Sequence, residues 1–325
     1  MQSIGELFSL PDVRRAREFF AHKSRAMTPK LMSVSDAVTR FVHDGDYLAS
    51  GGFGSVRVAT AVLHEIVRQR ITHLGFAGHT ATHDFQILAA GRCFDRCDAA
   101  YIVGLEVRGL SPNARRYMES GQVCVTEWSN ATLGWRYKAA AMGVPFLPAS
   151  SLMGTDTFKY SGAKEIECPF TGQKLIAVPA LFPDVGIIHV HRADMYGNAQ
   201  VDGISVADWD IARASKRLII TTERIVSTDE IRRDPSKTMV PYWLTDAVCL
   251  VPYGSYPCNM PYEYLSDEAH FAEWMDAEKD QTSLDAFLDK YIFGTRDFAE
   301  YLTLKGGEAR MAELRALEPL KRGEV

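Results

Sequence analysis

The 325-residue sequence predicts an α/β fold, with an open, mostly parallel β-sheet flanked by helices. Residues 47–50 form a short apolar stretch that ends in a glycine-rich loop, and residues 59–68 then show the helical spacing of apolar residues. The same order of strand and glycine-containing loop recurs at residues 74–78. Residues 218–222 form a β-branched run that is typical of a central strand covered on both faces.

Length, charge and cysteine content exclude several classes of protein. The length fits one large domain or two closely joined ones. The net charge of −5 argues against nucleic acid as the main partner, and no apolar run is long enough to span a bilayer. The six cysteines are scattered and complete no zinc pattern, so we expect reduced thiols in a cytoplasmic protein.

We expect three regions along the chain. Residues 1–32 form an N-terminal helical arm, residues 33–305 form the main domain, and residues 306–325 form a C-terminal helical tail. The arm is basic and carries Phe19 and Phe20, which suggests one or two short amphipathic helices that pack over the core or at a subunit interface. No apolar run follows its basic part, so we expect no secretory signal.

Further elements of the main domain follow from local patterns. Ser33 or Ser35 is expected to cap a helix over 33–42, and Ser111 with Pro112 to begin a helix through Met118. Residues 153–172 are irregular and suggest a loop excursion or a small hairpin near a substrate channel. The other expected elements are strands at 99–104, 175–179, 185–191 and 247–251, helices ending at 142 and covering 208–215, and a hairpin turn at 196–199.

The loop of Gly51, Gly52, Phe53 and Gly54 is the first candidate site. A strand, a bare loop and a helix start in this order can build an anion site from free backbone N–H groups, and these groups could hold the oxyanion of a thioester adduct. The loop matches neither the dinucleotide fingerprint nor the P-loop. Taken alone, it favours a simpler interpretation, a tight turn whose glycines permit positive φ.

Several polar side chains invite a chemical role, and for each we favour a structural one. His79, His83 and Asp84 are expected to line a cleft. His189 and His191 point to one face of a strand, but histidine has many structural uses and no metal is expected. Glu223 is expected to accept backbone N–H bonds from the next loop.

The motifs taken together resemble a known family. They are Asp44-Gly45 with Gly51-Gly52-Phe53, the Ala-rich helix end and Pro-Phe-Leu-Pro turn at 139–148, and the segments 223–237, 246–248 and 251–257. This combination is similar to the first subunit of class I coenzyme A transferases, most of all to the A subunit of glutaconate CoA-transferase, over roughly residues 33–305. Where the wider signature has Gly and Pro, this chain has Arg57 and Ala59, and the arginine favours the glutaconate branch.

The resemblance implies a CoA-transferase (NagB/RpiA-like) fold and a two-subunit enzyme. Such an enzyme moves CoA between an acyl-CoA, for example acetyl-CoA, and a carboxylic acid, which in this branch is a dicarboxylic acid. A glutamate of the partner B subunit carries the CoA as a thioester. No Ser-Glu-Asn-Gly motif occurs here, so we expect this chain to act only in a hetero-oligomer, A2B2 or larger, with CoA thioester as substrate and no permanently bound cofactor.

By the same resemblance, Gly51 to Gly54 form the oxyanion loop. Leu105 and Glu106 depart from the small polar residues of glutaconate enzymes, which predicts another substrate; Glu106 and Arg108 could instead form a solvated pair. Asn130 favours transfer over hydrolysis, because an amide orients a carbonyl but takes no proton from water. The predicted substrate-binding residues are Arg57, His79, Leu105, Glu106, Arg108 and Asn130.

Three alternatives remain open on the same scaffold. They are a subunit of a ring-cleaving hydrolase that acts on a CoA thioester, a subunit of a glutaconyl-CoA-type decarboxylase, and a non-catalytic subunit that binds acyl-CoA. The identity of the partner's residue at the glutamate position would distinguish the enzymes.

Overall fold

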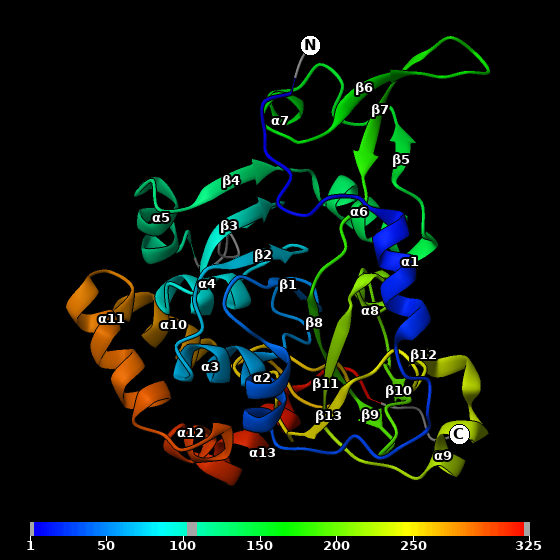
Figure 1. The fold of residues 1–325 in the computed structure, drawn as a ribbon. Helices are drawn as coiled ribbons and strands as arrows, with labels where there is room; N and C mark the ends of the chain where they lie inside the picture. The colour runs from blue at the N-terminus through cyan, green and yellow to red at the C-terminus, as the bar shows by residue number, and fades with distance from the viewer. Residues whose placement is uncertain (1–2, 103–108, 322–325) are drawn as a thin grey trace.

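A seven-stranded parallel sheet forms the centre of the computed structural model, which describes residues 3–102 and 109–321 (Figure 1). The strand order is β13-β11-β8-β1-β2-β3-β4, and every neighbouring pair is parallel. The predicted fold class is therefore confirmed. The strands are β1 (Tyr47–Ser50), β2 (Leu74–Gly78), β3 (Phe94–Ala99), β4 (Cys124–Glu127), β8 (Val185–Val190), β11 (Arg217–Thr222) and β13 (Ala247–Leu250).

The sheet separates two hydrophobic cores. Side chains of a strand alternate between its faces, so Tyr47 and Ala49 enter one core and Leu48 enters the other. Ile187 and Ile188 divide in the same way. Both faces are thus covered, which explains why these strands read as continuous apolar runs.

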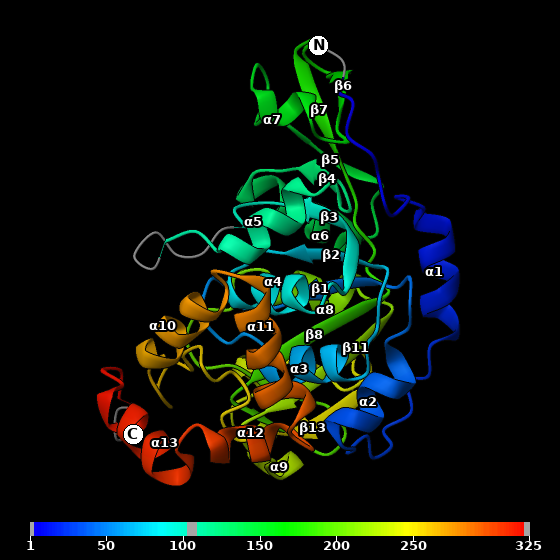
Figure 2. The same ribbon diagram turned by 90° about the vertical axis from the view of Figure 1, so that its left-hand side faces the viewer.

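Helices cover both faces of the central sheet (Figure 2). Ser33 and Ser111 cap two of these helices, as predicted. The smaller layer holds α6 (Asn130–Met142) and α8 (Asp208–Ala214). The larger layer holds α2 (Val34–Phe41), α3 (Thr60–Arg68), α4 (His83–Ala90) and α5 (Pro112–Glu119), followed by α10 (Glu268–Ala277), α11 (Gln281–Leu288), a π-helical turn (Asp289–Phe293), α12 (Phe298–Leu304) and α13 (Gly307–Leu317).

Two small antiparallel sheets complete the fold. One has the order β5-β7-β6, with β5 (Phe146–Ala149), β6 (Lys164–Glu167) and β7 (Lys174–Pro179), and lies beside α7 (Asp156–Lys159). The predicted irregular region 153–172 thus contains a short helix and one strand of a hairpin, at the top of Figure 1. The other sheet has β9 (Arg192–Ala193), β10 (Ala199–Gln200) and β12 (Thr238–Val240), near α9 (Thr228–Arg233) and a 3₁₀ turn at Pro235–Lys237, and confirms the turn at 196–199.

The strand predicted at 99–104 was wrong for residues 100–102, and residues 103–104 lie outside the described part of the chain. The strand of this region is β3, which ends at Ala99. Half of its residues are polar or charged. Cys97 and Asp98 both lie buried, on opposite faces of the sheet, and Asp98 accepts a hydrogen bond from the indole N–H of Trp128 at 2.5 Å. The prediction chose the run at 99–104 because it is more apolar. The true strand contains Asp98, whose hydrogen bond inside the protein allows a polar residue to be buried there.

The N-terminal arm packs over the core. It contains a single helix, α1 (Val13–His22), whose Ala16 is buried against Ala139 and Ala140 of α6. Beyond it, Lys23 Nζ lies 2.7 Å from the Asp246 carboxylate. In the described part of the chain, no helix has the length and apolar character needed to cross a membrane.

Candidate active site

The candidate active site lies at the carboxyl edge of the sheet, where the strand order reverses. The chain passes from β1 outward through β2, β3 and β4, and returns to β8 on the other side of β1. Open α/β sheets bind ligands in the crevice at such a switch point. The glycine-rich loop that follows β1 stands at this place.

The loops at this edge hold strained backbone. Arg57, Thr80 and Tyr101 follow β1, β2 and β3 respectively, and each has a φ of 52° to 56°. This left-handed region disfavours side chains with a Cβ, and a β-branched threonine in particular. Such strain persists only where the surrounding structure enforces it, and it gathers at functional sites.

The amides of the glycine-rich loop are not free in this chain, which corrects the prediction of an oxyanion loop built from unpaired N–H groups. Each amide of residues 51–54 already donates a hydrogen bond inside the protein. The acceptors are Ile187 O for Gly51 (2.9 Å), Asp208 Oδ1 for Gly52 (2.7 Å), Val56 O for Phe53 (3.0 Å) and Thr80 O for Gly54 (2.9 Å).

Arg57 also has a different role from the substrate contact predicted for it. Its side chain is fully buried, and Nη1 lies 2.5 Å from Oδ2 of the equally buried Asp208. Nη2 donates to Ile204 O at 2.7 Å. Arg57 therefore links the glycine-rich loop to α8 and to the loop before it, and it does not face the surface.

Close contacts explain two of the glycines. A Cβ on Gly51 would lie 2.6 Å from Asp208 Oδ1, and Gly52 has a φ of +86° with its missing Cβ 2.5 Å from Val56 O. Sequence reasoning identified Asp208 only as an acidic residue near the positive end of a helix. Its acidic character at that position was the available signal, but nothing local pointed to a loop 156 residues away.

The structure brings three other predicted residues together. His79 Nε2 lies 2.8 Å from the backbone oxygen of Asn130, and the rings of His79 and Phe53 are 5.4 Å apart. These residues come from the loops after β1 and β2 and from the first residue of α6. They form one wall at the carboxyl edge, as a shared substrate site requires.

This wall has buried polar atoms that lack a hydrogen-bond partner in the described part of the chain. They are His79 Nδ1, Thr80 Oγ1 and Asn130 Oδ1. Desolvation lowers the pKa of His79, which favours the neutral ring, and because Nε2 must donate to a carbonyl, Nδ1 is left as an acceptor. Buried atoms of this kind are normally satisfied, so the wall is suited to a ligand or partner.

Leu105, Glu106 and Arg108, which were predicted to bind substrate, lie outside the described residues.

The histidines near the end of β8 are used within the fold. His189 bonds to Thr221 Oγ1 at 2.8 Å and to Glu223 Oε1 at 2.7 Å, while His191 Nε2 bonds to Pro261 O. Glu223 Oε2 also accepts the N–H of Tyr253 at 2.7 Å. The structural role predicted for Glu223 is thus confirmed, but the N–H bond comes from the loop after β13 and not from the loop that follows Glu223.

The buried carboxylates at this edge are all engaged inside the chain as described. Asp208 and Glu223 hold the contacts given above. Burial raises the pKa of Asp84 to about 6, and its Oδ1 accepts N–H bonds from Thr82 and Phe85 at 2.8 and 3.0 Å. None of these three carboxylates is available as a nucleophile.

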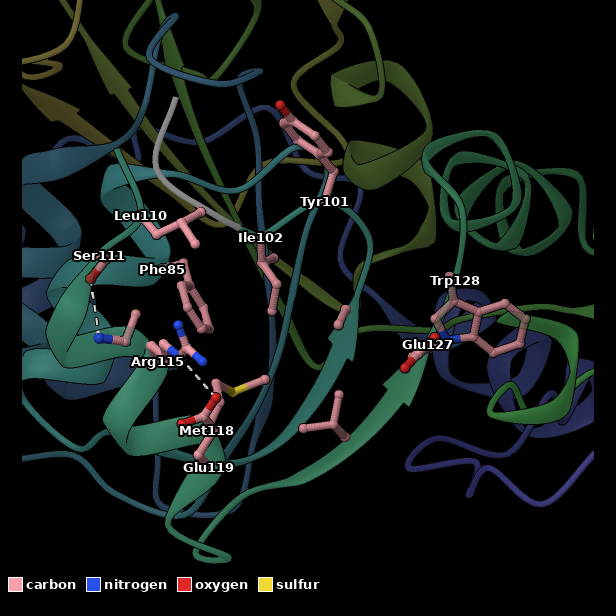
Figure 3. A pocket seen from close by; sticks show the side chains of 13 residues that line it. Phe85, Tyr101, Ile102, Leu110, Ser111, Arg115, Met118, Glu119, Glu127 and Trp128 are labelled. Atoms are coloured by element: carbon pink, nitrogen blue, oxygen red, sulfur yellow. Dashed lines mark hydrogen bonds and ion pairs between the residues drawn. The ribbon is translucent and has the colours of Figure 1, made fainter. Parts of the chain in front are cut away.

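A pocket of about 440 Å³ lies beside this wall, between α5 and the ends of β3 and β4 (Figure 3). Figure 3 shows Phe85, Ile102, Leu110 and Met118 on one side, with Glu127 and Trp128 at the end of β4 on the other. Trp128 stands two residues before Asn130, so the pocket and the polar wall share one edge of the sheet.

Comparison with known proteins gives the family. Residues 31–250 match the model of the coenzyme A transferase family. The chain is 34% identical to the A subunit of glutaconate CoA-transferase from Acidaminococcus fermentans over 90% of this chain and 96% of that protein. It is also 34% identical to the A subunit of 3-oxoadipate CoA-transferase from Pseudomonas knackmussii, over 87% of this chain and 99% of that protein.

Solved structures are also similar to this chain. The crystal structure of glutaconate coenzyme A-transferase from Acidaminococcus fermentans superposes with a TM-score of 0.85 at 32% identity, covering 91% of this chain and 98% of that one. A variant of the decarboxylase AibA/AibB superposes with a TM-score of 0.71 at 28% identity, covering 80% of this chain and 98% of that one. The sequence, the fold and these similarities show that this chain belongs to the coenzyme A transferase family, among its A subunits.

Proposed function

We propose that this chain is the A subunit of a two-subunit CoA-transferase that moves CoA between an acyl-CoA and a carboxylic acid. One observation carries the proposal. The site has a wall of unsatisfied polar atoms around Phe53, His79, Thr80 and Asn130, while its buried carboxylates are already bonded. Among the described residues, these buried carboxylates are therefore unavailable as nucleophiles, and two relatives at 34% identity are A subunits of CoA-transferases.

The B subunit is proposed to supply the nucleophile, a glutamate carboxylate. The carboxylate attacks the acyl carbon and forms a mixed anhydride as the CoA thiolate leaves. The thiolate then attacks the glutamyl carbonyl, which gives a glutamyl-CoA thioester and releases the first acid. The second acid repeats these steps in reverse order and leaves as its CoA thioester, so CoA is conserved throughout.

This chain would contribute the opposite wall. The hydroxyl of Thr80 can donate a hydrogen bond to the acyl oxygen as it gains charge, the task first expected of the loop amides. The glycine-rich loop instead holds Phe53 against His79. The CoA thioester is the substrate, and no further cofactor is proposed.

The complex is proposed to work in the cytoplasm. All six cysteines are free thiols in the structure, and four of them are buried. Such cysteine usage is typical of a reducing compartment.

A reconstitution experiment tests this function. We expect the purified chain alone to be inactive, and the complex with its B partner to exchange CoA between acetyl-CoA and a set of carboxylic acids without net loss of thioester. Net release of CoA would indicate a hydrolase, and release of carbon dioxide a decarboxylase. Either of these results, or the absence of any reaction in an intact complex that binds acyl-CoA, would contradict the proposal.

A further inference from the structure

The pocket beside α5 has walls that offer little to a polar ligand. Phe85 supplies an aromatic face, and Ile102, Met118 and Val125 supply aliphatic ones. The indole N–H of Trp128 is already donated to Asp98, and the hydroxyl of Ser111 to Glu278 Oε1 at 2.7 Å. A polar group that entered this pocket would lose its water and find these wall groups occupied.

The charges of the described lining residues are also unsuited to an anion. Among the described lining residues the cation is Arg115, which lies on the outer surface and pairs with Glu119 at 2.9 Å. About two thirds of each side chain in this pair is exposed, so it is a surface pair. The third charged residue, Glu127, carries the same sign as a carboxylate ligand.

The pocket lies at the same edge of the sheet as the candidate active site. Phe85 lies in the first turn of α4, directly after the loop that carries His79 and Thr80. Trp128 lies two residues before Asn130, and the strained Tyr101 forms part of the rim. An acyl group held at the polar wall would therefore have this pocket as its neighbouring apolar space. The volume of about 440 Å³ is within the range of small-molecule sites.

We propose that this pocket holds the acyl chain of the substrate, and that it selects an apolar monocarboxylic acid with an aromatic or branched chain over a dicarboxylic acid. The proposal rests on the proposed function for the chemistry of the thioester. It differs from the dicarboxylic acid that the glutaconate branch implies, because a second carboxylate would lie among apolar side chains beside Glu127.

Substrate competition in the reconstituted complex tests the proposal. With acetyl-CoA as donor, we expect kcat/KM for phenylacetate to exceed that for glutarate at least tenfold. Met118→Arg, which adds a cation to the pocket wall, should shift this ratio toward glutarate at least tenfold. Leu110→Arg should shift it in the same direction, and is a second variant at a residue that is 54% exposed and therefore more tolerant of change.

Met142→Arg is the matched control, since Met142 is exposed at the end of α6 outside the pocket, and it should leave the ratio unchanged. Calorimetry with phenylacetyl-CoA and glutaryl-CoA gives a readout that does not depend on transfer. A complex that hydrolyses or decarboxylates, yet binds phenylacetyl-CoA at least tenfold more tightly, would support the pocket and reject only the transferase. Equal or tighter binding of glutaryl-CoA would overturn the inference.

Discussion

Asp208 occupies the position at the glycine-rich loop that the sequence suggested for a bound anion. Its carboxylate accepts the Gly52 N–H, packs against Gly51 and pairs with Arg57. The fully buried carboxylate and guanidinium compensate each other's charge, because an unpaired charge in the interior has a large desolvation cost. The glycine motif and Arg57 are therefore explained by a partner inside the chain.

Removal of this partner should destabilise the protein. We predict that Asp208→Ala lowers the free energy of unfolding by about 3–5 kcal/mol, since Arg57 would remain buried without its counter-charge. Urea denaturation of the purified chain measures the change. Asp229→Ala removes an exposed carboxylate that pairs with Arg232 and should change stability by less than about 1 kcal/mol. An equal loss of unfolding free energy in the two variants would show that the buried pair stabilises the protein no more than the exposed pair does.

The C-terminal helices dock on the sheet layer through buried histidines and aromatic rings. His64 of α3 lies 4.6 Å from the ring of Tyr301 in α12, and His83 of α4 lies 5.0 Å from the ring of Trp274 in α10. His270 of α10 is 6.1 Å from His83. Desolvation lowers the pKa of His64 and of His270 well below 6.5, so this contact requires neutral imidazoles.

This contact should make the fold sensitive to acid. In the unfolded chain these histidines take up protons near pH 6.5, whereas in the folded chain they stay neutral. The stabilisation is complete above pH 6.5 and declines as the pH falls, by up to about 1.4 kcal/mol per pH unit for each histidine. We expect His270→Phe to show a shallower decline than the wild type in urea denaturation between pH 7 and 5.

His22→Phe, at an exposed position of α1, is the control and should keep the wild-type pH dependence. If His270→Phe and the wild type declined in parallel, the histidine would not be the source of the acid sensitivity.

Local patterns predicted most elements but not their long-range contacts. The strands at β1, β2 and β11 and the helix caps at Ser33 and Ser111 depend on neighbouring residues, so the sequence was sufficient for them. β3 was misplaced because the polar Asp98 is satisfied by Trp128, a residue from another element. For the site, the placement of His79 and Asn130 together was predictable, whereas the pairing of Arg57 with Asp208 was not.

At the scale of the whole molecule, the proposed function assigns half of a reaction site to this chain. The switch point of the sheet gathers Phe53, His79 and Asn130, and a largely apolar pocket lies beside them. The buried carboxylates at this edge are bonded to the chain itself, and the described carboxylates that line the pocket are Glu119, which pairs with Arg115, and Glu127. The proposed two-subunit function therefore depends on which subunit carries the reacting carboxylate.

Locating the covalent intermediate tests this point most directly. The reconstituted complex would be incubated with acetyl-CoA in the absence of an acceptor acid, and the CoA adduct mapped by mass spectrometry of its peptides. We predict a CoA thioester on a glutamate of the B subunit, with none on this chain. A thioester on Glu127 of this chain would contradict the account.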